Sequence, residues 1–229
     1  MKQHVSSAIV LKRTNYGEAD RIIQVITPNQ GKLSLMVKGV RKVNSKLAGS
    51  IELFCIIDIT YLLGRGSIDR LITARLKKHF SNIVKDLDRT NSGYDFIKII
   101  NKITEDEVEE EWFSLLSDSM SFLDDFSINL DLVRVWFYLS VFMIMGNTPN
   151  LSKDSLGNEF KEKQEYDFDL ETMSFTPKEK GSYVANHIKI LKLANQFQPT
   201  KMVNIQNCEK LSNDLYPLIR SIAKTNLDI

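Results

Sequence analysis

Apolar and polar residues alternate in short runs through the first 80 residues of the chain. In the run 32–38, Leu33, Leu35 and Val37 lie on one side of an extended strand, and the residues between them lie on the other side. The preceding segment 27–31 contains Pro, Asn and Gly, which favour a tight turn. Five such runs are predicted to be strands, at residues 8–11, 21–26, 32–38, 51–63 and 67–74. Five short strands joined by turns favour a small β-barrel.

After about residue 80, apolar residues recur at intervals of three and four, which is the spacing of helices. The pattern begins near Tyr94, and Thr104 with the acidic residues that follow it predicts the start of a second helix, with Thr104 as the N-cap. Between the later helices, residues 146–181 are irregular, and a short hairpin is expected from 166–170 and 173–175. The later helices are predicted at 129–145, 182–197 and 208–224.

The change of period divides the chain into a predicted barrel domain, 1–80, and a predicted helical domain, 81–229, and the charge divides at the same place. The whole chain is nearly balanced, with 30 basic and 29 acidic residues. Residues 1–80 hold 14 basic and 5 acidic side chains, a net charge of +9, whereas the rest holds 16 basic and 24 acidic, a net charge of −8. We therefore expect an α+β protein whose barrel faces a polyanion.

The basic residues of the first domain gather at strand ends and turns, and most densely in the segment 38–46. Several long cations on one face neutralise phosphates without reading bases. Aromatic residues that could stack on bases are few, with Tyr16 and Tyr61 as the main candidates. This pattern favours a nucleic acid, bound mainly through its backbone. The predicted nucleic-acid-binding residues are Lys12, Arg13, Arg21, Lys32, Lys38, Arg41, Lys42, Lys46 and Arg65.

Motifs of catalysis and of metal binding are missing from the sequence. The three histidines do not form HExxH or another metal-ligand spacing, and there is no P-loop, GxGxxG or GxSxG motif. The two cysteines, Cys55 and Cys208, are too few for a disulfide framework or a four-cysteine metal site, and Cys55 is expected in the core. We therefore predict no catalytic residues, no cofactor and no metal site, and an enzyme is the weaker interpretation.

The location of the protein is predicted from its most apolar stretch and its first residues. Residues 132–145 are only 14 long, short of the roughly 20 that cross a bilayer, and are expected to form a buried helix. The first residues lead into a strand-like run without the apolar region of a secretory signal. A cytoplasmic protein without a membrane partner is expected, in agreement with the low cysteine content.

Three motifs in the first domain resemble the RecO family of DNA repair proteins, which are recombination mediators. They are Tyr16-Gly17-Glu18-Ala19-Asp20-Arg21, Thr27-Pro28-Asn29-Gln30-Gly31-Lys32-Leu33-Ser34, and Val37-Lys38-Gly39-Val40-Arg41-Lys42 with Ser45-Lys46-Leu47. The resemblance is specific over residues 8–75 and weaker beyond them, where 146–151 is similar to the family's Gly-x-x-Pro-x-Leu. Among the basic residues, it singles out Arg21, Lys32, Lys38, Arg41, Lys42 and Lys46 for DNA binding.

The resemblance to this family implies a fold, an activity and partners. It implies an N-terminal OB-fold barrel followed by an α-helical domain, and binding of single- and double-stranded DNA with annealing of complementary strands. It also implies loading of a recombinase onto DNA coated by single-strand-binding protein (SSB), with RecR and the C-terminal tail of SSB as partners. A bacterial cytoplasmic protein associated with the nucleoid is the matching location.

The chain departs from the family's pattern at the zinc module. Many family members follow the Pro-x-Leu motif with two cysteine pairs that bind zinc. Here the segment 151–157 contains no cysteine, and the second pair is absent as well. The resemblance therefore implies a degenerate zinc-module-like insertion at 146–181 that lacks the metal. In place of the metal, the side chains expected to hold this segment together by packing are Tyr166, Phe168, Met173 and Phe175.

Two other function classes remain open at this point. One is a protein-interaction adaptor whose barrel has lost its affinity for DNA, which the charge asymmetry disfavours. The other is an RNA-binding OB-fold protein, which the family motifs disfavour and the charge pattern does not.

Overall fold

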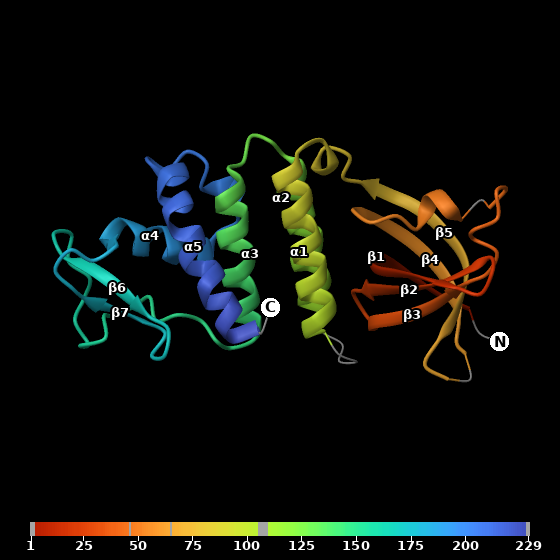
Figure 1. Ribbon diagram of the computed structural model, residues 1–229, viewed down its shortest axis with the longest axis horizontal. Helices are drawn as coiled ribbons and strands as arrows, with labels where there is room; N and C mark the ends of the chain where they lie inside the picture. Colours follow the sequence, from red (N-terminus) through yellow and green to blue (C-terminus); the bar gives the residue numbers. More distant parts are fainter. Residues whose placement is uncertain (1–2, 46, 65, 105–109, 228–229) are drawn as a thin grey trace. The chain divides into compact units, whose positions relative to one another are not determined.

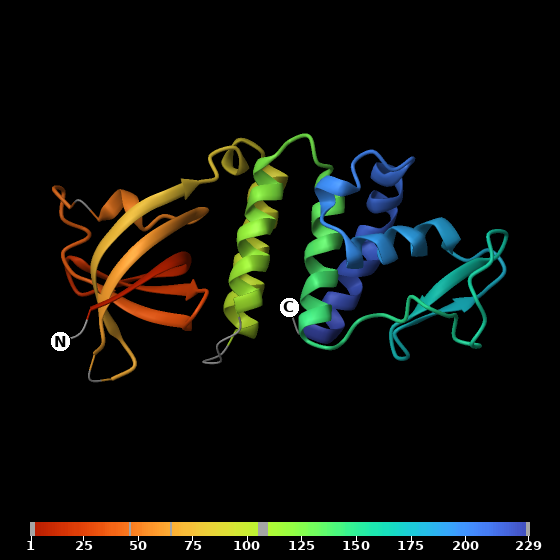
Figure 2. The same ribbon diagram turned by 180° about the vertical axis from the view of Figure 1, so that it is seen from behind.

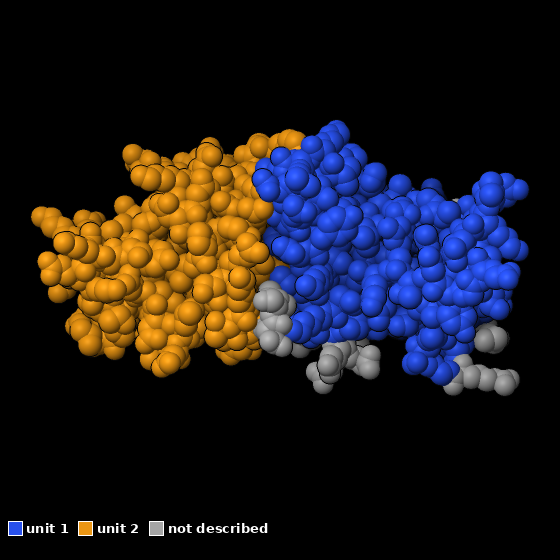
Figure 3. Space-filling model, viewed as in Figure 1, with its two compact units in different colours: residues 1–124 blue, residues 125–229 orange. Residues whose placement is uncertain are grey.

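The protein folds into two compact units, residues 1–124 and residues 125–229 (Figure 3). The computed structural model describes residues 3–45, 47–64, 66–104 and 110–227. Among these residues, the first unit contains a β-barrel and two α-helices, and the second contains three α-helices and a small sheet (Figure 1). The predicted division at residue 80 falls at the end of the last barrel strand, and whether 1–80 forms a domain by itself stays a prediction.

Five strands close into a barrel in the order β1-β2-β3-β5-β4. Neighbouring strands are antiparallel except for β3 and β5, which close the barrel as a short parallel pair that matches Leu35 with Asp69 and Met36 with Arg70. The predicted α+β class and barrel are confirmed. The strands, visible from both sides in Figures 1 and 2, are β1 (Gln3–Tyr16), β2 (Asp20–Thr27), β3 (Gly31–Val37), β4 (Cys55–Leu62) and β5 (Asp69–His79).

Alternate residues of these strands point inward and fill the barrel. The alternation predicted for the third strand holds, since Leu35 and Val37 are fully buried and Leu33 packs against the same cluster. The loop that follows β3 closes one end of the barrel, because its apolar residues Val40 and Ile51 belong to this cluster too. The cluster therefore joins strands that are distant in sequence with the basic loop.

Helices α1 (Leu87–Ile103) and α2 (Glu110–Asp124) cover part of the outer face of the barrel (Figure 1). Ile9 and Ile26 are paired across β1 and β2, and both are buried although they point away from the barrel interior. Gly93 permits close packing of α1, because a Cβ at this position would lie 2.6 Å from the ring atom Cε1 of Phe54. The outer face of the barrel is therefore exposed to solvent only where these two helices do not cover it.

The second unit is built around α3 (Leu130–Ile144), which packs against α4 (Ala185–Gln196) and α5 (Cys208–Leu227). The helix α3 is buried along most of its length, as predicted from its apolar stretch. Its first turn is capped by Asn129, whose side-chain oxygen accepts from the Leu132 amide at 2.9 Å. In the described part of the chain, no helix has both the length and the apolar content needed to cross a membrane.

The predicted hairpin in the segment 146–181 is confirmed. Strand β6 (Glu165–Asp169) pairs with β7 (Ser174–Pro177) and with β8 (Tyr183–Val184) in a three-stranded sheet. Tyr166 and Phe175 are buried, and the ring of Phe175 lies 5.0 Å from that of Phe168 and 6.1 Å from that of Phe160. Packing of aromatic rings thus holds the segment, as predicted, with Phe160 as a member that the sequence did not reveal.

Two of the strand boundaries that differ from the prediction have a clear physical reason. Strand β4 begins at Cys55 and not at 51. Ile51 is apolar because it packs into the core at the end of the barrel, and not because it belongs to the strand. Strand β1 is much longer than 8–11, because its first half pairs with β4 and its second half with β2. Thr104 caps the end of α1, since both its amide and its hydroxyl donate to the carbonyl of Ile100, at 3.0 and 2.6 Å, and the helix start predicted over the acidic residues that follow it lies outside the described residues.

Candidate nucleic-acid interface

The outer face of β1, β2 and β3 forms a continuous surface. The strand register determines which of its residues lie side by side. A bulge in β1 between Val10 and Lys12 resets the alternation, so that Lys12, Thr14 and Tyr16 all point outward. Across the three strands, Lys12 is in line with Gln24 and Ser34, and Thr14 with Ile22 and Met36. These side chains are half-buried or exposed, in contrast to Ile9 and Ile26 under the helices.

Beyond these rows, the turn between β1 and β2 is tied to the loop after β3. The amide of Gly39 donates to Asp20 Oδ1 at 2.7 Å, and the amide of Arg41 donates to the carbonyl of Ala19 at 2.9 Å. The guanidinium Nη1 of Arg41 donates to the carbonyl of Gly17 at 3.2 Å. Gly39 has a φ of +66°, a conformation that other residues adopt at a cost. These bonds fix the basic loop against the turn.

Three of the predicted residues are exposed cations on this surface. Lys12 lies on the outer face of β1, Lys38 follows directly after β3, and Lys42 lies in the fixed loop with its stem over Gly39. Among the described residues, none of the three ammonium groups has a hydrogen bond or ion pair. Their charges are therefore available to an anion.

Other predicted residues are already engaged within the first unit. Lys32 donates from Nζ to the carbonyl of Asn101 at 3.0 Å, so its charge meets the C-terminal end of α1. By the strand register, Arg13 and Arg21 lie on the inward-facing side of their strands, at the end of the barrel. Arg13 forms an ion pair with Glu52, and Arg21 donates from Nε to Asn15 Oδ1 at 3.0 Å. Their roles in binding stay predictions.

The last two predicted residues, Lys46 and Arg65, lie outside the described residues. Of the two aromatic candidates, Tyr16 is 55% exposed. Tyr61 is only 1% exposed and its hydroxyl donates to Gln30 Oε1 at 2.7 Å, so the expectation that it could stack on a base is wrong. It lies in the interior row of β4, where its ring fills the barrel.

Strand β5 adds cations that sequence reasoning did not include in the site. Arg70 lies opposite Met36 in the parallel pair, at the edge of the same outer face, and is exposed. Arg75 and Lys77 are exposed further along, where the ammonium of Lys77 lies 3.7 Å from Asp58 Oδ1. The parallel pairing of β3 with β5 places Arg70 here, and no local sequence signal predicts such a pairing.

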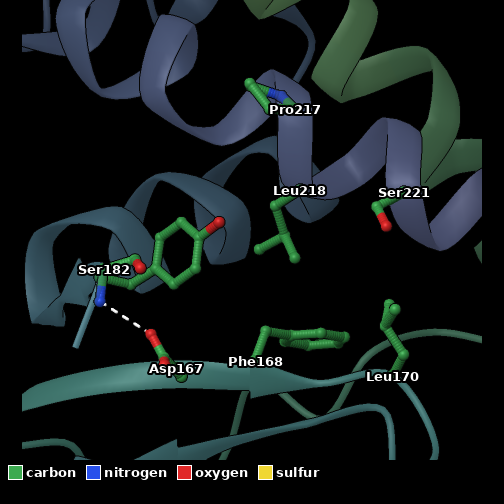
Figure 4. Close-up of a pocket in the computed structure, with 8 residues that line it drawn as sticks. Asp167, Phe168, Leu170, Ser182, Pro217, Leu218 and Ser221 are labelled. Atoms are coloured by element: carbon green, nitrogen blue, oxygen red, sulfur yellow. Dashed lines mark hydrogen bonds between the residues drawn. The ribbon is translucent and has the colours of Figure 1, made fainter.

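The second unit contains a cavity of about 360 Å³ between the hairpin and α5 (Figure 4). The Ser182 amide donates to Asp167 Oδ1 at 2.9 Å, and the ammonium of Lys178 binds the same carboxylate. The bond from Lys178 and then the bond from Ser182 hold the pKa of Asp167 below its usual range, so the carboxylate stays ionised near neutral pH. This favours a structural role over proton transfer. The cavity is lined by Asp167, Phe168, Leu170, Ser182, Tyr183, Pro217, Leu218 and Ser221.

Potential metal ligands are dispersed in the structure. Within residues 3–45, 47–64, 66–104 and 110–227, His, Cys, Asp and Glu do not gather in groups of three or more that could hold a metal ion. Asp154, in the segment where the zinc module was considered, is buried and accepts from the amides of Leu156 and Asn158, each at 2.9 Å. Its carboxylate organises a turn in this way.

The strand order and the exposed outer face define the class of the first unit. A five-stranded barrel closed by a parallel pair of β3 with β5 is an OB-fold, whose β2–β3 face binds oligonucleotides in many proteins. The sequence model called "Recombination protein O N terminal" matches residues 1–80, which are the strands of this barrel.

The similarity to known proteins extends beyond the barrel. The DNA repair protein RecO of Desulforamulus reducens is 27% identical over 238 residues, which cover 100% of this chain and 91% of that protein. The RecO of Desulfatibacillum aliphaticivorans is 32% identical over 151 residues, 65% of this chain and 58% of that protein. The RecO of Rubrobacter xylanophilus is 26% identical over 66% of this chain and 60% of that protein. With the last two, the match therefore spans less than two thirds of the relative.

Residues 1–80 thus match the family model of the RecO N-terminal domain, and the whole chain is similar to a protein named DNA repair protein RecO. The family is named for DNA repair and recombination, and the names of these relatives mention no chemical reaction.

Proposed function

We propose that this protein is a DNA-binding mediator of recombinational repair and that it catalyses no covalent reaction. The observation that carries the proposal is the set of unpaired cations, Lys12, Lys38 and Lys42, on one accessible surface of an OB-fold barrel. Long cations on strands and loops neutralise phosphates whatever the base sequence, so single- and double-stranded DNA both fit. Lys46 and Arg65, which lie outside the described residues, stay predicted DNA contacts.

We also propose that the protein anneals complementary DNA strands. Two single strands repel each other through their phosphates, and a protein that places cations between them lowers this repulsion. The fixed loop supports the idea, since the bonds of Gly39 and Arg41 hold the backbone that carries Lys38 and Lys42 before DNA arrives.

The similarity to RecO proteins supports further partners. We propose that the protein acts with RecR and with the C-terminal tail of SSB, and that it helps to load a recombinase onto SSB-coated DNA. It would do so in the cytoplasm, in association with the nucleoid. We propose that it needs no zinc, because aromatic packing already holds the segment 146–181.

The test is an annealing assay with two complementary oligonucleotides that carry a donor and an acceptor dye, with and without SSB. We expect the purified full-length protein to accelerate annealing in both cases. Failure to bind either strand would contradict the proposal and favour the protein-interaction adaptor. Competition with RNA of equal length and sequence separates the remaining alternative, because a clear preference for RNA would favour an RNA-binding OB-fold protein.

A further inference from the structure

We propose that the outer face of β1, β2 and β3 binds an unpaired DNA strand, with the ring of Tyr16 stacked on a base. The inference rests on the proposed function. It adds the form of DNA that this face prefers and the residue that distinguishes an unpaired strand from a duplex.

Tyr16 differs from the tyrosines that have structural roles in this protein. The hydroxyl of the buried Tyr61 donates to Gln30, and the hydroxyl of the buried Tyr166 accepts from the Lys161 amide at 2.9 Å. Tyr16, by contrast, is 55% exposed. Within the described part of the chain, the side chain of Tyr16 has no hydrogen bond and no contact with another ring. Among the described residues, no side-chain hydrogen bond and no ring contact therefore accounts for an aromatic ring at this position.

The neighbours of Tyr16 extend its ring into an apolar strip. Tyr16 is the last residue of β1, and the next outward row along the strands contains Ile22 and Met36, both half-buried. The flat faces of bases stack on aromatic rings and contact such apolar side chains when the bases are unpaired. In a duplex these faces are covered by the neighbouring base pairs. The strip therefore favours a single strand.

Cations lie on both sides of this strip. Lys38 directly follows Val37, the end of β3 that pairs with Arg21 next to Asp20, and Arg70 lies beside Met36 at the β5 edge. Lys12 lies four residues from Tyr16 on the same strand, about 13 Å away at the usual rise of a strand. Asp20, the acidic residue of these rows, already accepts the Gly39 amide at 2.7 Å. An apolar strip bordered by cations complements a strand with apolar bases and anionic phosphates.

The turn that carries Tyr16 is held before any ligand binds. Arg41 donates to the carbonyls of Gly17 and Ala19, so the residues that follow Tyr16 are fixed to the basic loop. A ring on a fixed turn loses little freedom on binding, which raises its contribution to affinity.

The test compares the variants Tyr16→Ala and Tyr16→Phe with the unmodified protein, using oligo-dT and a duplex of equal length. For Tyr16→Ala we expect the Kd for oligo-dT to rise by about fivefold to a hundredfold, with little change for the duplex. Tyr16→Phe keeps the ring and should keep the affinity. A matched control is Phe197→Ala, which removes an exposed ring from the second unit. Equal melting temperatures show that each variant is folded.

The variant Tyr16→Trp supplies a direct readout. Trp112 and Trp136 are 6% and 8% exposed, so an added tryptophan at position 16 would be the accessible fluorophore. We expect its fluorescence to be quenched by oligo-dT and much less by the duplex. The inference would be overturned if Tyr16→Ala lost equal affinity for oligo-dT and for the duplex. It would also be overturned if the unmodified protein bound oligo-dT and Tyr16→Ala bound it equally well. A lack of DNA binding by the unmodified protein would instead contradict the proposed function.

Discussion

Replacing Lys12, Lys38 and Lys42 together by glutamine removes three positive charges from the accessible surface of the barrel. The three side chains are exposed and, among the described residues, without acidic partners, so their loss leaves no carboxylate unpaired. Each lysine that contacts a phosphate of a single strand contributes about 0.7 to the slope of log K against log salt. Three contacts therefore contribute roughly 2 to the slope, which corresponds to a loss of affinity of about fiftyfold at about 0.15 M salt.

The assay is fluorescence anisotropy of a labelled oligonucleotide at four or more salt concentrations. A matched control replaces Lys153, Lys161 and Lys163, which are exposed in the second unit, and so removes the same charge elsewhere. We expect the control to keep the slope of the unmodified protein, and both variants to keep their stability, since exposed substitutions change it by about 0.5 kcal/mol at most. An unchanged slope in the barrel variant, or equal changes in both variants, would refute the assignment of this surface.

Two further predictions concern the first unit. Gly39→Ala places a Cβ on a residue in the left-handed conformation, so it should lower the free energy of unfolding, measured in urea, by about 1–2 kcal/mol and should also lower the affinity for DNA. The control is Gly49→Ala, which should change neither quantity, because φ is not positive there and an added Cβ meets no atom within 4 Å. A similar loss in both variants would contradict the role of Gly39. Burial, and then the charge of Glu52, raises the pKa of the Cys55 thiol to about 11, so it stays protonated at neutral pH. Cys55 should therefore react with a thiol reagent only on unfolding, and rapid modification of the folded protein would contradict its burial.

Local patterns in the sequence were sufficient to predict the elements whose contacts are close together in the chain. The alternation around Leu35 and Val37 predicts a strand with one core face, and the structure confirms it. The hairpin of β6 and β7 follows in the same way from Tyr166 and Phe175, which are both buried. In each case the residues that form the contact are close together in the sequence.

Features that depend on distant contacts could not be predicted from the sequence. Lys32 has the spacing of an exposed lysine, but α1 passes over it and accepts its hydrogen bond. Tyr61 is an aromatic residue in a basic segment, yet its strand turns the ring inward. Arg70 joins the candidate site only because β5 pairs with β3. Which lysine or tyrosine faces solvent is decided by register and helix packing, and a single sequence does not contain this information in local form.

The distribution of charge takes on a different meaning once the units are known. Residues 81–124 hold 4 basic and 11 acidic side chains and belong to the same compact unit as the basic barrel, although four of these acids, at 105–109, lie outside the described residues. The first unit therefore carries 18 basic and 16 acidic residues, close to balance. Since screening limits the reach of surface charges to about 8–10 Å, local placement decides where a phosphate binds. The acidic helices cover the row of Ile9 and Ile26, which leaves the row of Tyr16 and the basic loop as the surface that we propose for DNA.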